Sequence, residues 1–165
     1  MHLEKLVNKL LETYVGGDEY FDNLDLNIRK NNKYFRYMLD TIKNEDFDYI
    51  IVSGHFGKSF TNYCKKNNIY ENKIILVNGS LRKNNEIDTK LICKIDNKKV
   101  IFIDDSCYSK TTINKVKKYI ENNHGNFIKT YVFYDGCKEK DNNIVSFYRY
   151  YDNFEVSWYY ENKEI

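Results

Sequence analysis

The chain has 165 residues, a hydrophobic fraction of 42% and a net charge of +2, from 26 basic and 24 acidic side chains. A chain of this length suits one domain, and it can bury a substantial core without disulfides or a structural metal. The near balance of charge argues against an obligate nucleic-acid binder, because such proteins usually carry a strong basic excess. We therefore expect a single domain over residues 1–165.

The first part of the chain has the periodicity of helices. Apolar side chains recur at helical spacing over residues 2–14, and Gly16 and Gly17 are expected to end this helix. A second helix is expected over about residues 28–43, with apolar side chains along one face. Together these two stretches predict an N-terminal helical segment.

Short apolar runs that end in polar or glycine residues follow from residue 49 onward. They cover residues 49–52, 74–77, 100–103 and 127–134. Such unalternated runs are typical of strands that are buried on both faces. Helical stretches at about 56–66 and 110–123 lie between several of them, and this alternation predicts parallel pairing through right-handed crossovers. The expected fold is α/β, with a central, mainly parallel sheet flanked by helices.

The stretch from Leu81 to Ile95 departs from this pattern. It begins with a charged segment, residues 82–86, and continues as a half-alternating run over residues 87–95. We expect a mobile loop that leads into an edge strand.

The strongest local pattern for chemistry lies between Lys99 and Thr112. Four apolar residues lead to Asp104 and Asp105 at the expected carboxyl end of a strand, where ligands bind in open α/β sheets. The hydroxyl-rich turn over residues 109–112 then enters a helix, and such a turn presents free backbone N–H groups to a phosphate. Because carboxylates can accept hydrogen bonds from sugar hydroxyls, this segment predicts a site for a ribose phosphate.

This segment resembles the motif with which type I phosphoribosyltransferases bind phosphoribosyl pyrophosphate (PRPP). The shared features are an apolar strand, two acidic residues, a short spacer and a turn similar to Thr-Gly-x-Thr. The resemblance implies that Asp104 and Asp105 hold the ribose 2′- and 3′-hydroxyls and belong to the catalytic residues. It also implies that the residues that bind PRPP, most of them around the 5′-phosphate, include Ser106, Ser109, Lys110, Thr111 and Thr112.

The order of elements is similar to that family from about residue 48 onward. The turn after the first strand matches the pyrophosphate loop in position, which adds Ser53, Gly54, His55 and Lys58 to the residues implied to bind PRPP. The Gly79–Ile87 stretch matches the flexible catalytic loop, so Arg82 and Lys83 are implied to be catalytic. Two aromatic residues are implied to contact the base, by their places in the chain: Tyr134 and Trp158.

Lys110 stands where this family usually has glycine. Its ammonium could bind phosphate as a point charge, or the site could have lost turnover. Two functions therefore stay open. The first is a phosphoribosyltransferase that moves a phosphoribosyl group from PRPP to a nitrogenous, purine-like base and releases pyrophosphate, with Mg²⁺ bound mainly through PRPP. The second is a non-catalytic module of the same fold that binds PRPP or a nucleotide. Either form could be a homodimer.

These patterns also have plain structural interpretations. Asp104 and Asp105 fit a solvated strand end, and Ser109 fits a helix N-cap. Residues 53–58 fit an ordinary turn between a strand and a helix. Residues 148–151, Tyr-Arg-Tyr-Tyr, fit a base contact or a partner surface equally well.

The cysteines are far apart in the sequence and form no CxxC pair; they are Cys64, Cys93, Cys107 and Cys137. This spacing argues against a zinc cluster and defines no disulfide framework. Scattered cysteines beside a sizeable core are typical of a reducing cytosol, so we expect a cytoplasmic protein. Neither a signal peptide nor an apolar stretch of membrane-spanning length is recognisable.

Overall fold

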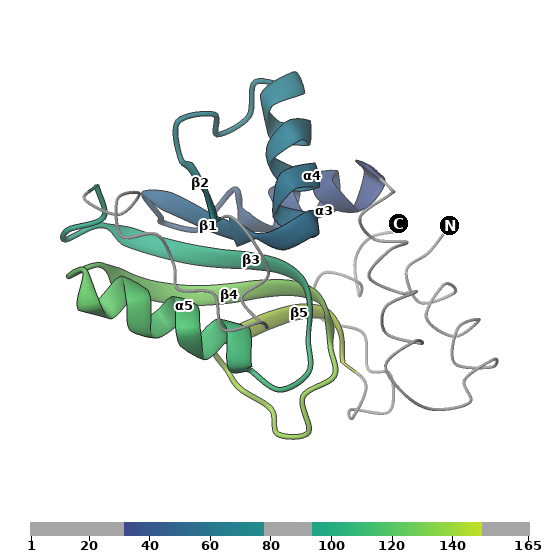
Figure 1. The fold of residues 1–165 in the computed structure, drawn as a ribbon. Helices are drawn as coiled ribbons and strands as arrows, with labels where there is room; N and C mark the ends of the chain where they lie inside the picture. The colour runs from purple at the N-terminus through teal and green to yellow at the C-terminus, as the bar shows by residue number, and fades with distance from the viewer. Residues whose placement is uncertain (1–31, 78–93, 150–165) are drawn as a thin grey trace.

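A five-stranded parallel sheet forms the centre of the protein in a computed structural model, which describes residues 32–77 and 94–149 (Figure 1). The order of the strands across the sheet is β2-β1-β3-β4-β5, and all four neighbouring pairs are parallel. The strands are β1 (Tyr49–Ser53), β2 (Ile74–Val77), β3 (Lys99–Cys107), β4 (Asn126–Asp135) and β5 (Ile144–Arg149). The predicted α/β fold with a mainly parallel sheet is confirmed.

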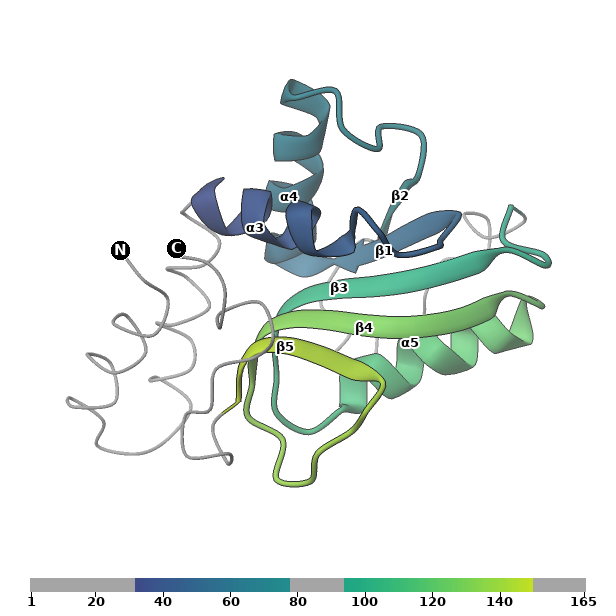
Figure 2. The ribbon, with the colours of Figure 1, turned by 180° about the vertical axis from the view of Figure 1, so that it is seen from behind.

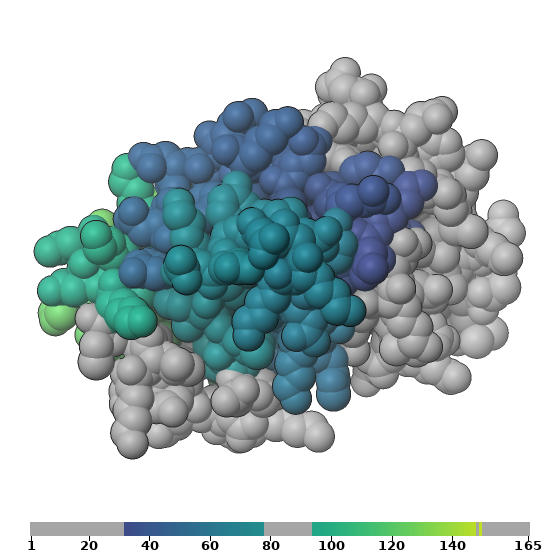
Figure 3. Space-filling model, turned by 90° about the horizontal axis from the view of Figure 1, so that it is seen from above, coloured from purple at the N-terminus to yellow at the C-terminus, as the bar shows by residue number. Residues whose placement is uncertain are grey.

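Helices cover both faces of this sheet (Figures 1 and 2). Helices α3 (Asn32–Ile42) and α4 (Gly54–Lys66) pack on one face, and α5 (Thr111–Asn122) packs on the other. Seen from above, α3, α4 and the segment leading to β2 form most of the described surface (Figure 3). No helix in the described ranges is both long and apolar enough to cross a membrane.

The central strand β3 shows why the apolar runs are continuous rather than alternating. Ile101 and Ile103 pack into the core under α3 and α4, whereas Val100 and Phe102 pack into the core against α5. All four side chains are fully buried. Because burying one such side chain stabilises the fold by about 1.5–3 kcal/mol, both faces of the strand must be apolar.

Helix α3 presents its apolar residues to the same core. Tyr34, Phe35, Met38 and Ile42 are buried, and they recur at the spacing that places side chains on one helical face. The aromatic rings extend this packing between elements, since Phe35 contacts the ring of Phe56 in α4 at a centroid distance of 5.7 Å. The earlier helix expected over residues 2–14 and the strand expected over 87–95 lie outside the described residues, apart from Lys94 and Ile95, which are not in a strand.

Strand β3 is longer than predicted. It continues past Ile103 to Cys107, because β4 extends alongside it and pairs Cys107 with Asp135. The acidic pair Asp104 and Asp105 therefore lies within the strand rather than at its end. Asp105 is buried and Asp104 is partly exposed, so the interpretation of the pair as a solvated strand end is wrong for Asp105.

Strand β5 was not predicted. It pairs in parallel with β4, with Thr130 opposite Ile144 and Asp135 opposite Arg149. The connection over residues 136–143 must return the chain by the length of about five strand residues, roughly 17 Å. Eight residues can span about 26–29 Å when extended, so the return needs no helix. The strand-helix-strand pattern that identified the other pairings is consequently missing here.

Candidate functional site

A cleft of about 350 Å³ lies where β3 ends and α5 begins. This volume is within the range of small-molecule sites. Most of the residues predicted around a ribose phosphate line this cleft: Asp104, Ser106, Ser109, Lys110, Thr111 and Thr112. Residues Cys107, Tyr108 and Ile113 complete its lining. These three were not predicted as site residues, because the family motif that guided the prediction consists of the acidic pair and the hydroxyl-rich turn.

The turn into α5 has the backbone shape that glycine favours. Lys110 has a left-handed conformation with φ of 60°, and its carbonyl accepts the hydrogen bond of Asn114 N at 2.8 Å. A side chain in this conformation costs roughly 1–2 kcal/mol, and glycine avoids that cost. Lys110 thus adopts, in a tight turn, the conformation that glycine favours, at the position where the resemblance leads one to expect glycine.

The helix N-terminus itself faces the cleft. Helix α5 begins at Thr111, and the first N–H groups of a helix have no partner within the helix. Lys110 rather than Ser109 is the N-cap residue, and no side chain caps this end. Ser109 Oγ instead lies 2.9 Å from Thr111 Oγ1. The turn thus combines hydroxyl groups with backbone donors, which is the arrangement that binds phosphate.

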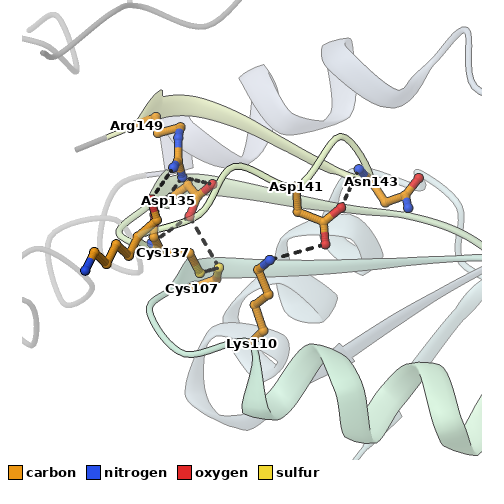
Figure 4. A network of polar contacts seen from close by, with 8 residues as sticks. Cys107, Lys110, Asp135, Cys137, Asp141, Asn143 and Arg149 are labelled. Carbon is orange, nitrogen blue, oxygen red and sulfur yellow. Dashed lines mark hydrogen bonds and ion pairs between the residues drawn. The ribbon is translucent and has the colours of Figure 1, made fainter. Parts of the chain in front are cut away.

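The ammonium of Lys110 is directed to the connection between β4 and β5. Its Nζ lies 3.5 Å from Asp141 Oδ2 (Figure 4). Both side chains are partly exposed, so the pair contributes at most about 1 kcal/mol. Because this attraction is weak, the lysine head is free to exchange Asp141 for a stronger anion.

The two acidic residues of the motif lie in different environments. Asp104 is partly exposed and lines the cleft, and its Oδ1 accepts the hydrogen bond of Asp105 N at 3.0 Å. Asp105 is only 4% exposed, is not part of the cleft lining, and accepts the hydrogen bond of Ser106 N at 2.9 Å. The hydroxyl oxygen of Ser106 is buried and has no hydrogen-bond partner in the part of the chain that the structure describes.

The predicted pyrophosphate turn lies, like the cleft, at the carboxyl ends of the strands, but it is not part of the cleft lining. Ser53 ends β1, and Gly54 follows with φ of 66°, which again favours glycine. His55 and Lys58 are exposed in the first two turns of α4. Because β1 and β3 are parallel neighbours, the carboxyl end of β1 lies beside that of β3.

The structure describes one of the two residues predicted to contact the base, Tyr134. Tyr134 is fully buried in β4, and its ring lies 6.1 Å from that of Tyr108, which lines the cleft. Tyr134 therefore lies behind Tyr108 and is not part of the cleft lining, and its direct contact with a base stays a prediction. Trp158 and the two basic residues predicted to be catalytic, Arg82 and Lys83, lie outside the described residues.

A buried polar network behind the turn was also missed (Figure 4). Arg149 Nη1 donates to Asp135 Oδ2 at 2.9 Å and to the carbonyl of Cys137 at 2.8 Å. Asp135 Oδ1 accepts a hydrogen bond from Cys137 N at 2.9 Å and one from the thiol of Cys107 at 3.6 Å. The only sequence signal was Asp135 at the end of a predicted strand, since the contact with Arg149 depends on β5.

Comparison with known proteins identifies the fold. No protein-family model matches the chain, and no curated protein matches it. Solved structures do match. An adenine phosphoribosyltransferase from Thermoanaerobacter pseudethanolicus is 18% identical, with a TM-score of 0.55 over 74% of this chain and 84% of that one. A purine phosphoribosyltransferase from Pyrococcus horikoshii is 12% identical, with a TM-score of 0.52 over 72% and 81%. The protein therefore has the type I phosphoribosyltransferase fold.

Proposed function

We propose that the protein transfers a phosphoribosyl group from PRPP to a nitrogenous base and releases pyrophosphate. The observation that carries this proposal is the cleft itself. It combines a partly exposed carboxylate, Asp104, with the hydroxyl-rich turn at the N-terminus of α5. A carboxylate suits sugar hydroxyls, and a helix N-terminus suits a phosphate. The matched solved structures, which are named as phosphoribosyltransferases, support the same reaction.

Each part of the cleft has a role in this proposal. Asp104 accepts hydrogen bonds from the ribose, and Ser109, Thr111 and Thr112 surround the 5′-phosphate together with the first backbone N–H groups of α5. Lys110 adds its charge when its ammonium leaves Asp141. Positioning and electrostatic stabilisation are then the protein's contribution to cleavage of the bond to pyrophosphate.

Mg²⁺ fits this set of donors because it prefers carboxylate, hydroxyl and water oxygens. Asp104 is the acidic residue in the cleft lining and is the side chain that we assign to the ion's surroundings. When bound mainly through PRPP, the ion would neutralise charge on the leaving pyrophosphate. His55 and Lys58, exposed in the first two turns of α4, are the candidates to bind the same leaving group.

A purine is the first base to test. The matched structures include an adenine phosphoribosyltransferase from Saccharomyces cerevisiae, 12% identical with a TM-score of 0.50 over 72% of this chain and 81% of that one, in complex with an iminoaltritol bisphosphate and adenine. Among the described residues, Tyr108 is the aromatic side chain that lines the cleft, so it is the candidate to contact the base. Cytoplasmic location and a homodimer stay predictions, checked by fractionation and by sedimentation.

The experiment is an assay of pyrophosphate release from PRPP and Mg²⁺ with a panel of purine and pyrimidine bases. We expect release that requires one class of base, and that is lost with a chelator and in Asp104→Asn. Calorimetric titration of PRPP runs in parallel. Binding of PRPP without release for any base would favour the non-catalytic module. Absence of both binding and release would contradict the assignment of the cleft.

A further inference from the structure

Two cysteines that are 30 positions apart meet behind the cleft. The sulfur atoms of Cys107 and Cys137 lie 2.7 Å apart, and both side chains are buried, with exposed fractions of 6% and 3%. Cys107 is the last residue of β3 and also lines the cleft. Both pack with Ile113 in the core against α5. The third described cysteine, Cys64, is buried in the core on the other face of the sheet.

The backbones on both sides of this pair are already fixed. Gly136 N donates to the carbonyl of Cys107 at 2.8 Å, and Cys137 N donates to Asp135 Oδ1 at 2.9 Å. Arg149 donates to the carbonyl of Cys137 at 2.8 Å. Because a disulfide has an S–S length of about 2.05 Å, the sulfurs need to approach by only about 0.65 Å. We assign this movement to the two side chains, since hydrogen bonds hold the backbone at Cys107 and at Cys137.

A metal ion is the competing occupant, since Cys107, Asp135 and Cys137 form a group of metal-ligand type. Asp135 already binds the guanidinium of Arg149 at 2.9 Å and the backbone N–H of Cys137. A cation at this position would lie beside the positive charge of Arg149, and it would compete for the carboxylate that balances this charge. The pair of sulfurs therefore favours oxidation over metal binding.

We propose that Cys107 and Cys137 form a reversible intrachain disulfide with a low-molecular-weight disulfide as the oxidant. One thiolate attacks the small disulfide, forms a mixed disulfide and releases one small thiol. The second cysteine attacks the mixed disulfide and releases the other small thiol. The two protein thiols are thus oxidised by two electrons and lose two protons, and one small disulfide is reduced to two thiols. The cleft gives the oxidant access to Cys107.

The environment of the Cys107 thiol makes this reaction slow and selective. The hydrogen bond with Cys137, burial and the charge of Asp135 raise the pKa of the Cys107 thiol, so little thiolate is present at neutral pH. Once formed, the bond joins the last residue of β3 to the β4–β5 connection. The disulfide thereby fixes the start of the turn that begins at Tyr108.

The test uses the full chain, reduced and then incubated with oxidised glutathione. Free thiols are alkylated under denaturing conditions, and tryptic peptides are identified by mass spectrometry. The sequence places the two cysteines in separate peptides, residues 100–110 and 130–138. We expect these peptides to be linked, with the loss of two hydrogen masses, and to separate again after reduction. Cys64 should remain free for alkylation.

Two further measurements follow the oxidised protein. Closing a loop of this size should raise Tm by about 10 °C, and it should slow amide hydrogen exchange over residues 108–112. Both effects should be absent in Cys137→Ser and present in the matched control Cys64→Ser. Alkylation of both cysteines after oxidation, or a mixed disulfide with glutathione alone, would overturn the proposal. Thiol protection without mass loss that a chelator removes would overturn it in favour of a metal.

Discussion

Removal of the buried guanidinium, by Arg149→Met, should destabilise the fold strongly. The side chains of Arg149 and Asp135 are only 7% and 3% exposed. Methionine has a similar length, but it leaves the buried Asp135 carboxylate without the guanidinium that balances its charge. Breaking one side of a buried ion pair typically costs about 3–5 kcal/mol, because the remaining charge is not compensated. Loss of the hydrogen bonds to the carbonyls of Cys137 and Lys138 acts in the same direction.

The expected change in melting temperature follows from this free energy. For a chain of this size, 1 kcal/mol shifts Tm by about 2–4 °C, so Arg149→Met should lower Tm by roughly 6–20 °C. Arg149→Lys keeps the charge but not the planar set of donors, so it should recover part of the loss. The double variant Asp135→Asn with Arg149→Met removes both charges, and it should be more stable than Arg149→Met alone.

Urea denaturation followed by circular dichroism measures these differences directly. Lys43→Met is the matched control, because its ion pair with Asp40 at 2.7 Å has side chains that are 57% and 31% exposed. Exposed pairs of this kind contribute about 0.2–1 kcal/mol, so the control should remain close to the wild type. If Arg149→Met loses no more stability than Lys43→Met, the reasoning from the buried pair is refuted.

Five other substitutions, in three tests, probe the site and the core. Asp104→Asn should weaken PRPP binding at least tenfold in calorimetric titration, because it loses a charge-assisted hydrogen bond of about 1.5–3 kcal/mol. Asp105→Asn should mainly lower Tm. The reverse result would contradict the different roles that we assign to the two carboxylates. Lys110→Gly should weaken PRPP binding, and the loss of affinity should be smaller at high salt than at low salt, because salt screens the charge of the ammonium. Asp141→Asn should tighten PRPP binding, because it releases the ammonium. Tighter binding in Lys110→Gly would mean that the lysine blocks the turn. Burial raises the pKa of Cys64 from 9.0 to about 12, so the unfolded thiol ionises first. The contribution of Cys64 to the free energy of unfolding should be fully present below pH 9, and it should fall by about 1.4 kcal/mol per pH unit between pH 9 and 12. Urea denaturation of the wild type and of Cys64→Ala over this pH range measures that contribution.

The sequence was sufficient for the parts of the fold that local patterns determine. Strand β1 and the first half of β3 are buried on both faces, so their apolar composition alone identifies them. Strand β2, at the edge of the sheet, is also entirely apolar, although Ile74 and Leu76 are only partly buried. Helix α5 was equally clear, because its buried residues Ile113, Val116 and Ile120 recur at helical spacing. These features need no knowledge of distant contacts.

The remaining features depend on pairing between distant segments. The extension of β3 to Cys107 follows from the length of β4, and β5 has polar residues such as Ser146 that hide its burial pattern. The different environments of Asp104 and Asp105 cannot be read from adjacent identical residues. They follow from the position of the strand relative to α5 and to the cleft.

The β4–β5 connection links the missed features to the predicted site. It carries Cys137, which lies against the last residue of β3, and Asp141, which holds the ammonium of Lys110. A connection of this length without a helix has little internal structure to fix its path, and Arg149 supplies part of that support by binding two of its carbonyls. Arg149 therefore supports the connection that carries Asp141, the partner of the Lys110 ammonium, from 39 positions later in the chain than Lys110. A motif at the end of β3 can be recognised locally, but its geometry is completed by the neighbouring strand.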